Sequence, residues 1–486
     1  MKDIVASTLL VGGGSLINIA CSIVRSKVIS IVVGPVGIGL QGLLQGTMRT
    51  MISIANMSLQ TTGVREVARW RTEGDKEELG HTLRALGLAT LVLGALATLV
   101  LVVLQRPIGA AVLDDPALSW TLAVLGIGVF AQVLYATYDA FLRGFRRVPQ
   151  QTKASVVANL FAAAIGSVIV WQFGVAGIPF AIVAQPLFLL LSAAYVGRDL
   201  REHLVPPERA RTRKAMRRIL GTGIILAITA LLTPGVQLAA RVLIARWASL
   251  DEVGYFQAAS SVSLLYLGFV LGAMSLDYYP RLAEATHDHP ALRRMVNEQA
   301  RVSLLLAGPA VLGMIAMSDQ VVAVLYTSEF SVTADILRWQ LLGDVLKIGS
   351  WTLGYLVLAQ GKPVVYFLTE LTWNASYLIV LVVLLPSLGL RATPAAYIAA
   401  SGIYFLTVCI VTNRLAGFVW GRGNVVVMGS LAVLALAVLG AHHYLEAPWG
   451  WIAGVAITAA FGAVCLYRLV REVGFTRLLR GGKRQR

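Results

Sequence analysis

Charged residues are scarce in this sequence, and acidic ones are the scarcest. Only 14% of the 486 residues are Asp, Glu, Lys or Arg, whereas 57% are hydrophobic and the mean hydropathy is +0.74. Soluble globular domains carry about 25% charged residues, so this composition excludes an ordinary soluble protein. Apolar runs of about 20 residues, long enough to cross a bilayer, recur along the whole chain. We count about 14 of them and expect an all-α polytopic membrane protein.

Cysteine is also rare, and familiar nucleotide-binding motifs are missing. The three cysteines, Cys21, Cys409 and Cys465, all fall inside predicted membrane spans, so we expect no disulfide framework. The sequence contains no phosphate-binding P-loop, which argues against ATP hydrolysis on this chain. We therefore expect a membrane transporter and not an enzyme, with no cofactor and no metal site.

Basic residues outnumber acidic ones by 41 to 25, which gives a net charge of +16. A basic excess can indicate nucleic-acid binding, but here most of the cations lie in loops on one side of the predicted topology. Only Arg106 and Arg391 lie in loops on the opposite side. Cytoplasmic loops are enriched in Lys and Arg, so both termini are predicted to be cytoplasmic. We expect membrane lipids as partners and no nucleic acid.

The chain contains one long-range repeat. Residues 35–44 align with residues 250–259 when Gly39 is matched to Gly254, an offset of 215. Each repeat then holds six spans, and an even number of crossings gives both repeats the same orientation in the membrane. We therefore predict two lobes related by a pseudo-two-fold axis along the membrane normal. The predicted regions are 1–200 (N-terminal six-helix lobe), 201–218 (basic cytoplasmic linker), 219–412 (C-terminal six-helix lobe), 413–467 (an extra helix pair) and 468–486 (basic cytoplasmic tail).

Cationic side chains lie inside the first two predicted spans. A cation in the hydrocarbon region costs about 2.5–3.5 kcal/mol, so Arg25, Lys27 and Arg49 are expected to face a polar cavity or a partner. Arg25 and Arg49 share a depth of about 14 Å below the outer ends of their helices. Subtracting the repeat offset from Arg241 gives position 26, which places a cation of the second repeat at a corresponding level. We predict that these cations bind a pyrophosphate; alternatively, they extend to the outer interface or bind backbone carbonyls.

Polar side chains accompany these cations at a spacing of three or four residues, which places them on one face of each helix. Two such stripes on consecutive antiparallel spans are not expected to face lipid. The predicted polar wall of the cavity consists of Ser15, Asn18, Ser22, Gln45, Ser53, Asn56 and Gln60.

Charges of both signs occur in later spans. Asp344 and Lys347 are three residues apart, and we interpret them as a self-neutralising pair within the bilayer. The alternative is that Asp344, or Glu370 in the next span, exchanges H⁺ or Na⁺ during transport. Asp139, four residues before Arg143, is a further candidate for ion coupling.

Three segments resemble a known family: Gly34–Leu40, Asp251–Gln257, and Trp339–Lys347 followed by Gly354–Leu356. They are similar to Wzx-type O-antigen and enterobacterial-common-antigen translocases. These proteins form the polysaccharide transport branch of the MOP (multidrug/oligosaccharidyl-lipid/polysaccharide exporter) flippase superfamily. The resemblance covers about residues 4–412, and the last two spans lie outside the twelve-span pattern of the family.

The resemblance implies a MATE/MOP-like fold and a flippase of the bacterial inner membrane. Its substrate would be an undecaprenyl-pyrophosphate-linked oligosaccharide repeat unit, moved from the cytoplasmic to the periplasmic leaflet by alternating access. Lys27, Arg241, Asp344 and Lys347 correspond to charged positions in such proteins. A polysaccharide polymerase and a chain-length regulator are the protein partners that the resemblance suggests.

Three other functions stay open. A flippase for a lipid-linked peptidoglycan precursor would also bind a pyrophosphate. A multidrug or cation antiporter of the same superfamily should prefer acidic cavity walls. A membrane glycan polymerase or ligase should carry a large periplasmic loop, and the predicted outer loops are short.

Overall fold

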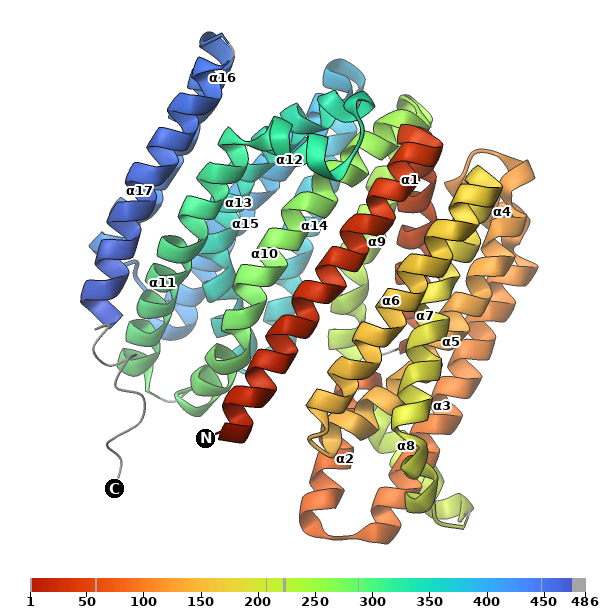
Figure 1. Ribbon diagram of the computed structural model, residues 1–486. Coiled ribbons are helices and arrows are strands. Elements are labelled where there is room, and N and C mark those ends of the chain that lie inside the picture. The colour runs from red at the N-terminus through yellow and green to blue at the C-terminus, as the bar shows by residue number, and fades with distance from the viewer. Residues whose placement is uncertain are drawn as a thin grey trace. The chain divides into compact units, whose positions relative to one another are not determined.

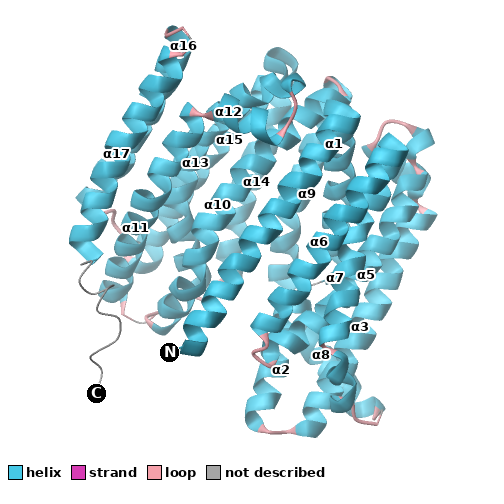
Figure 2. Cartoon of the chain, viewed as in Figure 1, coloured by secondary structure: helices cyan, strands magenta, loops and turns pink. Residues whose placement is uncertain are grey.

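The structure is a computed structural model that describes residues 2–56, 59–206, 208–221, 224–286, 288–446 and 448–473. The predicted basic tail beyond residue 473 lies outside these ranges. Figure 2 shows helices joined by short loops, with no strand in the described ranges. The predicted all-α fold class is confirmed.

The first helix, α1 (Lys2–Asn56), contains the first predicted span, residues 5–33, and most of the second, residues 40–63. The loop expected between them is a kink at Gly34, where φ is 63° and ψ is −159°. Glycine lacks a Cβ and is the residue that adopts this conformation readily. Pro35 follows and removes one helical N–H donor, so the chain bends here without leaving the helix for long.

The chain divides into two compact units (Figure 1), and unit 1 comprises Met1–Gln257 and Leu325–Glu329. Within unit 1, α1 packs on α6 and α9, α3 on α5, and α6 on α7. After α1, its helices are α2 (Leu59–Glu73), α3 (Lys76–Val103), α4 (Gln105–Val112), α5 (Trp120–Gly144), α6 (Val148–Phe173), α7 (Ile178–Val196), α8 (Arg209–Gly221) and α9 (Ile224–Trp247).

Unit 2 comprises Ala258–Val324 and Phe330–Arg486. In it, α13 packs on α15, α14 on α15, and α11 on α13, α16 and α17. The predicted boundaries of the six-helix lobes stay a prediction. The helices are α10 (Leu250–Glu284), which begins in unit 1, α11 (His289–Ala316), α12 (Ser318–Leu325), α13 (Ser331–Ala359), α14 (Pro363–Leu388), α15 (Ala392–Ala416), α16 (Arg422–Tyr444) and α17 (Trp449–Val473). Short 3₁₀ helices are η1 (Pro116–Leu118), η2 (Gly174–Gly177), η3 (Arg198–His203), η4 (Ser328–Phe330) and η5 (Gly389–Arg391).

Ten segments of the described chain are long and apolar enough to cross a membrane. Three of them, of 45, 49 and 54 residues, are more than twice the length of about 20 residues that one crossing needs. They contain the two halves of α1, α6 with α7, and α14 with α15. Counting these segments twice and adding the 35-residue α10 accounts for the predicted number of crossings.

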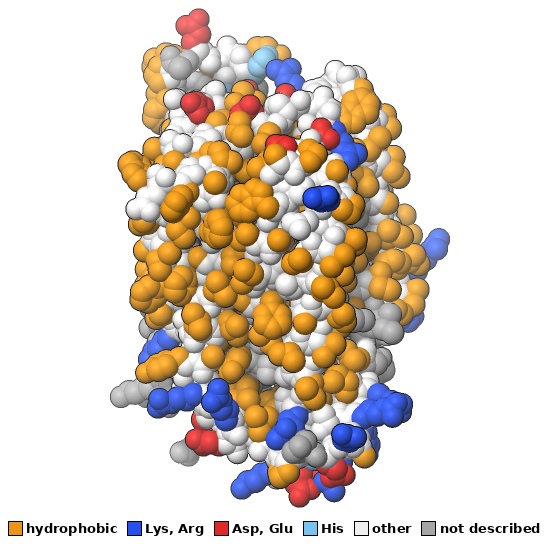
Figure 3. Space-filling model, turned by 90° about the vertical axis from the view of Figure 1, so that its right-hand side faces the viewer, with side chains coloured by type: hydrophobic (Ala, Val, Ile, Leu, Met, Phe, Trp, Pro, Cys, Tyr) orange, Lys and Arg blue, Asp and Glu red, His pale blue; other side chains and the backbone are white. Residues whose placement is uncertain are grey.

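The outer surface of α3 is strongly apolar. Leu88, Val92 and Leu99 are 49%, 52% and 56% exposed. Figure 3 shows a band of hydrophobic side chains on the face it draws, with Lys and Arg gathered at the lower end. Monomeric soluble proteins rarely expose apolar surface on this scale, so lipid covers this band.

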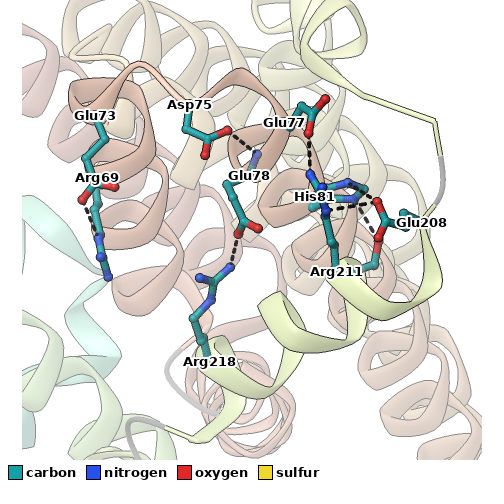
Figure 4. Close-up of polar contacts among 10 residues, drawn as sticks. Arg69, Glu73, Asp75, Glu77, Glu78, His81, Glu208, Arg211 and Arg218 are labelled. Atoms are coloured by element: carbon teal, nitrogen blue, oxygen red, sulfur yellow. Dashed lines mark hydrogen bonds and ion pairs between the residues drawn. The ribbon is translucent and has the colours of Figure 1, made fainter.

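The predicted linker contains a helix that is docked rather than free. In α8, Ile219 is only 1% exposed and belongs to a hydrophobic cluster with residues of α2 and α3. Arg211 binds Glu77 and Arg218 binds Glu78, both glutamates being in the first turn of α3 (Figure 4). The hydrogen bond to Glu77 raises the pKa of Arg211, which keeps its guanidinium charged. This part of the linker is therefore fixed to the first repeat.

The two repeat segments pack against each other within unit 1. A Cβ on Gly39 would lie 2.1 Å from the carbonyl oxygen of Leu250, and a Cβ on Gly254 would lie 2.1 Å from that of Pro35. Leu250 is the counterpart of Pro35, and Gly254 of Gly39, at the predicted offset. Reciprocal contacts of this kind are characteristic of a two-fold relation. Only glycine permits so close an approach of two backbones.

Candidate functional site

Arg25 begins a chain of polar side chains inside unit 1. Its Nη1 donates to Oε1 of Gln185 on α7 (3.1 Å), and Nε2 of Gln185 donates to Oδ1 of Asn159 on α6 (3.0 Å). Asn159 Nδ2 donates to Asn18 Oδ1 (3.0 Å), and Asn18 Nδ2 donates to Ser155 Oγ (3.2 Å). We call these five residues the amide network. Its side chains come from α1, α6 and α7. Its amide and hydroxyl groups can both donate and accept hydrogen bonds.

Arg25 and Arg49 are close enough to interact electrostatically. Their shared depth stays a prediction. Arg25 Nε is buried and bonds to no described residue, and Arg49 is exposed without a hydrogen bond to the described chain. Each guanidinium carries five N–H donors, so most donors of this pair are uncommitted. Two neighbouring cations of this kind favour a multivalent anion between them.

Lys27 and Arg241 are engaged elsewhere in unit 1. The Lys27 ammonium donates to the backbone carbonyl of Tyr326. Arg241 is 4% exposed; its Nε donates to Gln257 Oε1 (2.7 Å) and its Nη1 to the Gln237 carbonyl (2.8 Å). The contacts with the Tyr326 and Gln237 carbonyls correspond to the alternative in which the cations bind backbone carbonyls, and the Gln257 contact is an additional one. The four-cation site stays a prediction, and its contacts favour the Arg25–Arg49 pair.

The predicted polar stripe divides between two sets of contacts. Asn18 joins the amide network, whereas Gln60 Nε2 donates to Asp139 Oδ2 at 2.6 Å. Ser15 is exposed, and the other stripe residues, Ser22, Gln45, Ser53 and Asn56, are partly buried along α1.

Asp139 is completely buried in unit 1. Its oxygens accept from Gln60, from the Tyr135 hydroxyl (3.0 Å) and from Arg143 Nε (2.9 Å). A buried carboxylate that is paired and hydrogen-bonded in this way holds helices together. The arrangement favours a structural role for Asp139 over ion exchange, because a coupling ion would compete with Arg143.

Unit 2 contains a second buried carboxylate. Asp344, 0% exposed, accepts from the hydroxyls of Ser263 (2.7 Å), Tyr266 (3.1 Å) and Tyr397 (2.6 Å). Asp344 is on α13, and these donors come from α10 and α15. Three neutral donors satisfy a buried carboxylate without cancelling its charge.

Lys347 does not form the direct pair with Asp344 that the sequence spacing suggested. Its ammonium lies over the rings of Trp373 and Tyr397, 5.1 and 5.3 Å from their centroids. It interacts electrostatically with both Asp344 and Glu370. Glu370 Oε1 also accepts from the Tyr404 hydroxyl at 2.8 Å. One cation interacting with two acidic side chains leaves one negative charge unbalanced when both acids are ionised.

Sequence reasoning missed the partners of these charges. Ser155 and Asn159 are four residues apart on α6, and Gln185 is a lone amide in the apolar α7. Uncharged polar residues in membrane spans hydrogen-bond across helices, so their rarity in these spans was a usable signal.

The chain was compared with known families and proteins. The family model described as "Polysaccharide biosynthesis protein" matches residues 44–335, more than half of the sequence. The chain belongs to the polysaccharide biosynthesis protein family. It is 23% identical over 410 residues to the lipid III flippase of Escherichia coli (strain K12), which covers 83% of this chain and 96% of the relative. The lipid III flippase of Shigella flexneri gives the same values.

Solved structures place the fold among MOP-superfamily transporters. The lipid II flippase MurJ in an inward closed conformation matches with a TM-score of 0.70 at 12% identity, covering 96% of this chain and 99% of MurJ. An inward-facing MATE family transporter of the MOP superfamily matches with a TM-score of 0.69 at 16% identity, covering 82% and 98%. These relatives are transporters and not enzymes, as predicted.

The match to MurJ clarifies the extra helix pair. The 4% of 486 residues that it leaves uncovered is about 19 residues, fewer than the 23 of α16 or the 25 of α17. Neither helix therefore lies wholly outside the match to that fold.

Proposed function

We propose that this protein is a flippase for an undecaprenyl-pyrophosphate-linked oligosaccharide repeat unit of an O-antigen or related polysaccharide. The family, the lipid III flippase relatives and the Wzx-like segments support this substrate class. The single observation that carries the proposal is the Arg25–Arg49 pair beside the amide network. The pair suits a pyrophosphate, and the amides suit sugar hydroxyls, which also donate and accept.

The proposed transport step uses alternating access of two lobes. The pyrophosphate is held by the cations while the sugars lie along the polar wall, and the polyprenyl chain stays in lipid. The cluster of Asp344, Lys347 and Glu370 supplies a place for a coupling H⁺ or Na⁺. Movement runs from the cytoplasmic to the periplasmic leaflet of a bacterial inner membrane, with both termini cytoplasmic. A polymerase and a chain-length regulator would receive the product.

A lipid-linked peptidoglycan precursor is the second candidate substrate. The coverage of α16 and α17 by the MurJ fold favours it. A multidrug or cation antiporter shares the fold, but adjacent cations repel a cationic drug.

Deletion of the gene in its native host tests the two candidates. For a repeat-unit flippase, surface polysaccharide is lost, completed lipid-linked repeat units accumulate, and peptidoglycan synthesis continues. Lysis with accumulation of the peptidoglycan precursor would instead support the second candidate. Surface display of single, unpolymerised units would contradict a flippase and indicate a polymerase.

A further inference from the structure

Residues of α11, α16 and α17 line a pocket in unit 2 on the side that is predicted to be cytoplasmic. Its volume is about 630 Å³, which lies within the range of about 300–1,000 Å³ typical of ligand sites. Nothing in the proposed transport mechanism uses it. Its lining includes Arg301, Arg422, Gly423, Val426, Arg468 and Arg471.

The arginines converge from three different helices. Arg301 is on α11, Arg422 is the first residue of α16, and Arg468 and Arg471 are in the last turns of α17. In the described part of the chain, Arg422, Arg468 and Arg471 form no ion pair with an acidic side chain. The positive charge of these three arginines on α16 and α17 creates a potential that attracts anions.

The start of α16 adds to the positive potential and gives the pocket its shape. A helix N-terminus carries about half a positive charge. At the start of α16 the N-cap residue is Gly421, whose N–H donates to Asn297 Oδ1 at 2.7 Å, and its own position offers no capping side chain. Gly423 lies in the first turn, where an added Cβ would be 3.3 Å from Nη1 of Arg301. The absence of a side chain at position 423 therefore keeps the pocket open beside Arg301.

The surroundings of the pocket are apolar. Val425 and Val426 on α16 are 50% and 61% exposed, and Leu466 and Tyr467 on α17 are 63% and 65% exposed. A ligand that fits both the pocket and this surface has anionic groups in its head and hydrocarbon beyond it. Basic pockets between membrane helices on the cytoplasmic side bind phosphorylated lipid headgroups.

We propose that this pocket binds a lipid whose headgroup carries two phosphates. An arginine binds a phosphate through two parallel hydrogen bonds, so convergent arginines suit two phosphate groups better than one. Cardiolipin and undecaprenyl pyrophosphate share this chemistry. The proposal concerns lipid binding by α11, α16 and α17 and stands whether or not the chain transports repeat units.

Binding to the purified full-length protein tests the proposal. The probes are cardiolipin, undecaprenyl pyrophosphate and the one-phosphate lipid phosphatidylglycerol, added to detergent-solubilised protein and measured by native mass spectrometry. At least one two-phosphate lipid should bind about tenfold more tightly than phosphatidylglycerol. Preference for cardiolipin would assign a resident phospholipid, and preference for undecaprenyl pyrophosphate would assign the carrier of the transported unit; both support the site.

Variants test whether lipid binding depends on this pocket or only on the positive charge of the protein. The double substitution Arg468→Ala/Arg471→Ala should weaken two-phosphate binding by about tenfold or more. Gly423→Val should weaken it as well, although it changes no charge. Arg213→Ala/Lys214→Ala removes the same charge from the exposed face of α8 and should leave the affinity unchanged.

Three results would overturn the proposal. These are equal binding of all three lipids, equal loss of binding in the α8 control, and unchanged binding in the Arg468/Arg471 variant. Elution volume and melting temperature are measured for each variant. If Gly423→Val fails to fold, the arginine pair and its control decide the question alone.

Discussion

Arg241 donates from Nε to Oε1 of Gln257 across 2.7 Å inside unit 1. Nη1 of the same guanidinium donates to the Gln237 carbonyl, and its Cζ lies 5.8 Å from the centroid of the Phe256 ring. Arg25, by contrast, keeps a buried Nε without a partner in the described chain. The two repeats therefore use their cations differently, although the sequence places both at corresponding levels.

Alanine substitutions at these two positions should have different effects. Arg25→Ala should abolish transport while the melting temperature stays near that of the parent protein, because Arg25 makes one side-chain hydrogen bond. Arg241→Ala should lower the free energy of unfolding by about 2–3 kcal/mol, because buried oxygens lose their donors. Thermal unfolding and accumulation of lipid-linked repeat units measure the two effects. Equal destabilisation with normal transport per folded molecule would contradict the assignment.

The reciprocal contact of Gly39 and Gly254 predicts how much one added methyl group should destabilise the protein. Gly39→Ala and Gly254→Ala should each destabilise the protein by about 1–3 kcal/mol or more, because the added Cβ meets a backbone carbonyl that cannot rotate away. Gly87→Ala in α3 is the control, since nothing lies within 4 Å of a Cβ there. Similar melting temperatures for all three variants would show that the segments do not pack this closely.

The carboxylates of unit 2 should control the dependence of transport on ions. Asp344→Asn and Glu370→Gln each remove one negative charge while keeping an acceptor for the tyrosine hydroxyl. The stimulation of transport by an H⁺ or Na⁺ gradient should fall by about 5- to 150-fold, the usual size of coupling between two sites. Tyr404→Phe leaves both charges in place and should retain most of the stimulation. Full stimulation in both acid variants would exclude this cluster as the coupling site.

Asp139 should contribute to stability rather than to coupling. Asp139→Ala should lower the free energy of unfolding by about 3 kcal/mol, because it leaves three donors, one of them the Arg143 cation, without their acceptor. A double-mutant cycle with Arg143→Ala isolates the ion pair, with an expected coupling of about 0.5–3 kcal/mol. A normal melting temperature combined with lost ion dependence would reverse the assignment.

The sequence predicted depth and periodicity better than it predicted contacts. Helical rise predicts one level for Arg25 and Arg49, and the repeat offset aligned Gly39 with Gly254, whose segments the structure then shows in contact. It did not fix how far each helix is rotated about its axis, so Arg241 could be placed in depth but not in direction. Rotation is determined by packing between segments that are distant in sequence.

Spacing along one helix also did not predict which partners Asp344 and Lys347 would bind. Asp344 and Lys347 are close enough along one helix to pair, but hydroxyls of α10 and α15 occupy the carboxylate, and aromatic rings attract the ammonium. The connection between the first two spans is a second feature that the sequence did not predict correctly. A single glycine at position 34 and the following proline sufficed to bend a helix that composition alone divided into two.

The amide network has a polarity. Donation runs from Arg25 through Gln185, Asn159 and Asn18 to Ser155, and no member donates backwards along this series. Aligned hydrogen bonds polarise one another, so the charge at the head strengthens every later bond. Loss of the bond from Arg25 to Gln185 should therefore weaken the later bonds of the series. Through these bonds the cation on α1 is linked to side chains of α6 and α7.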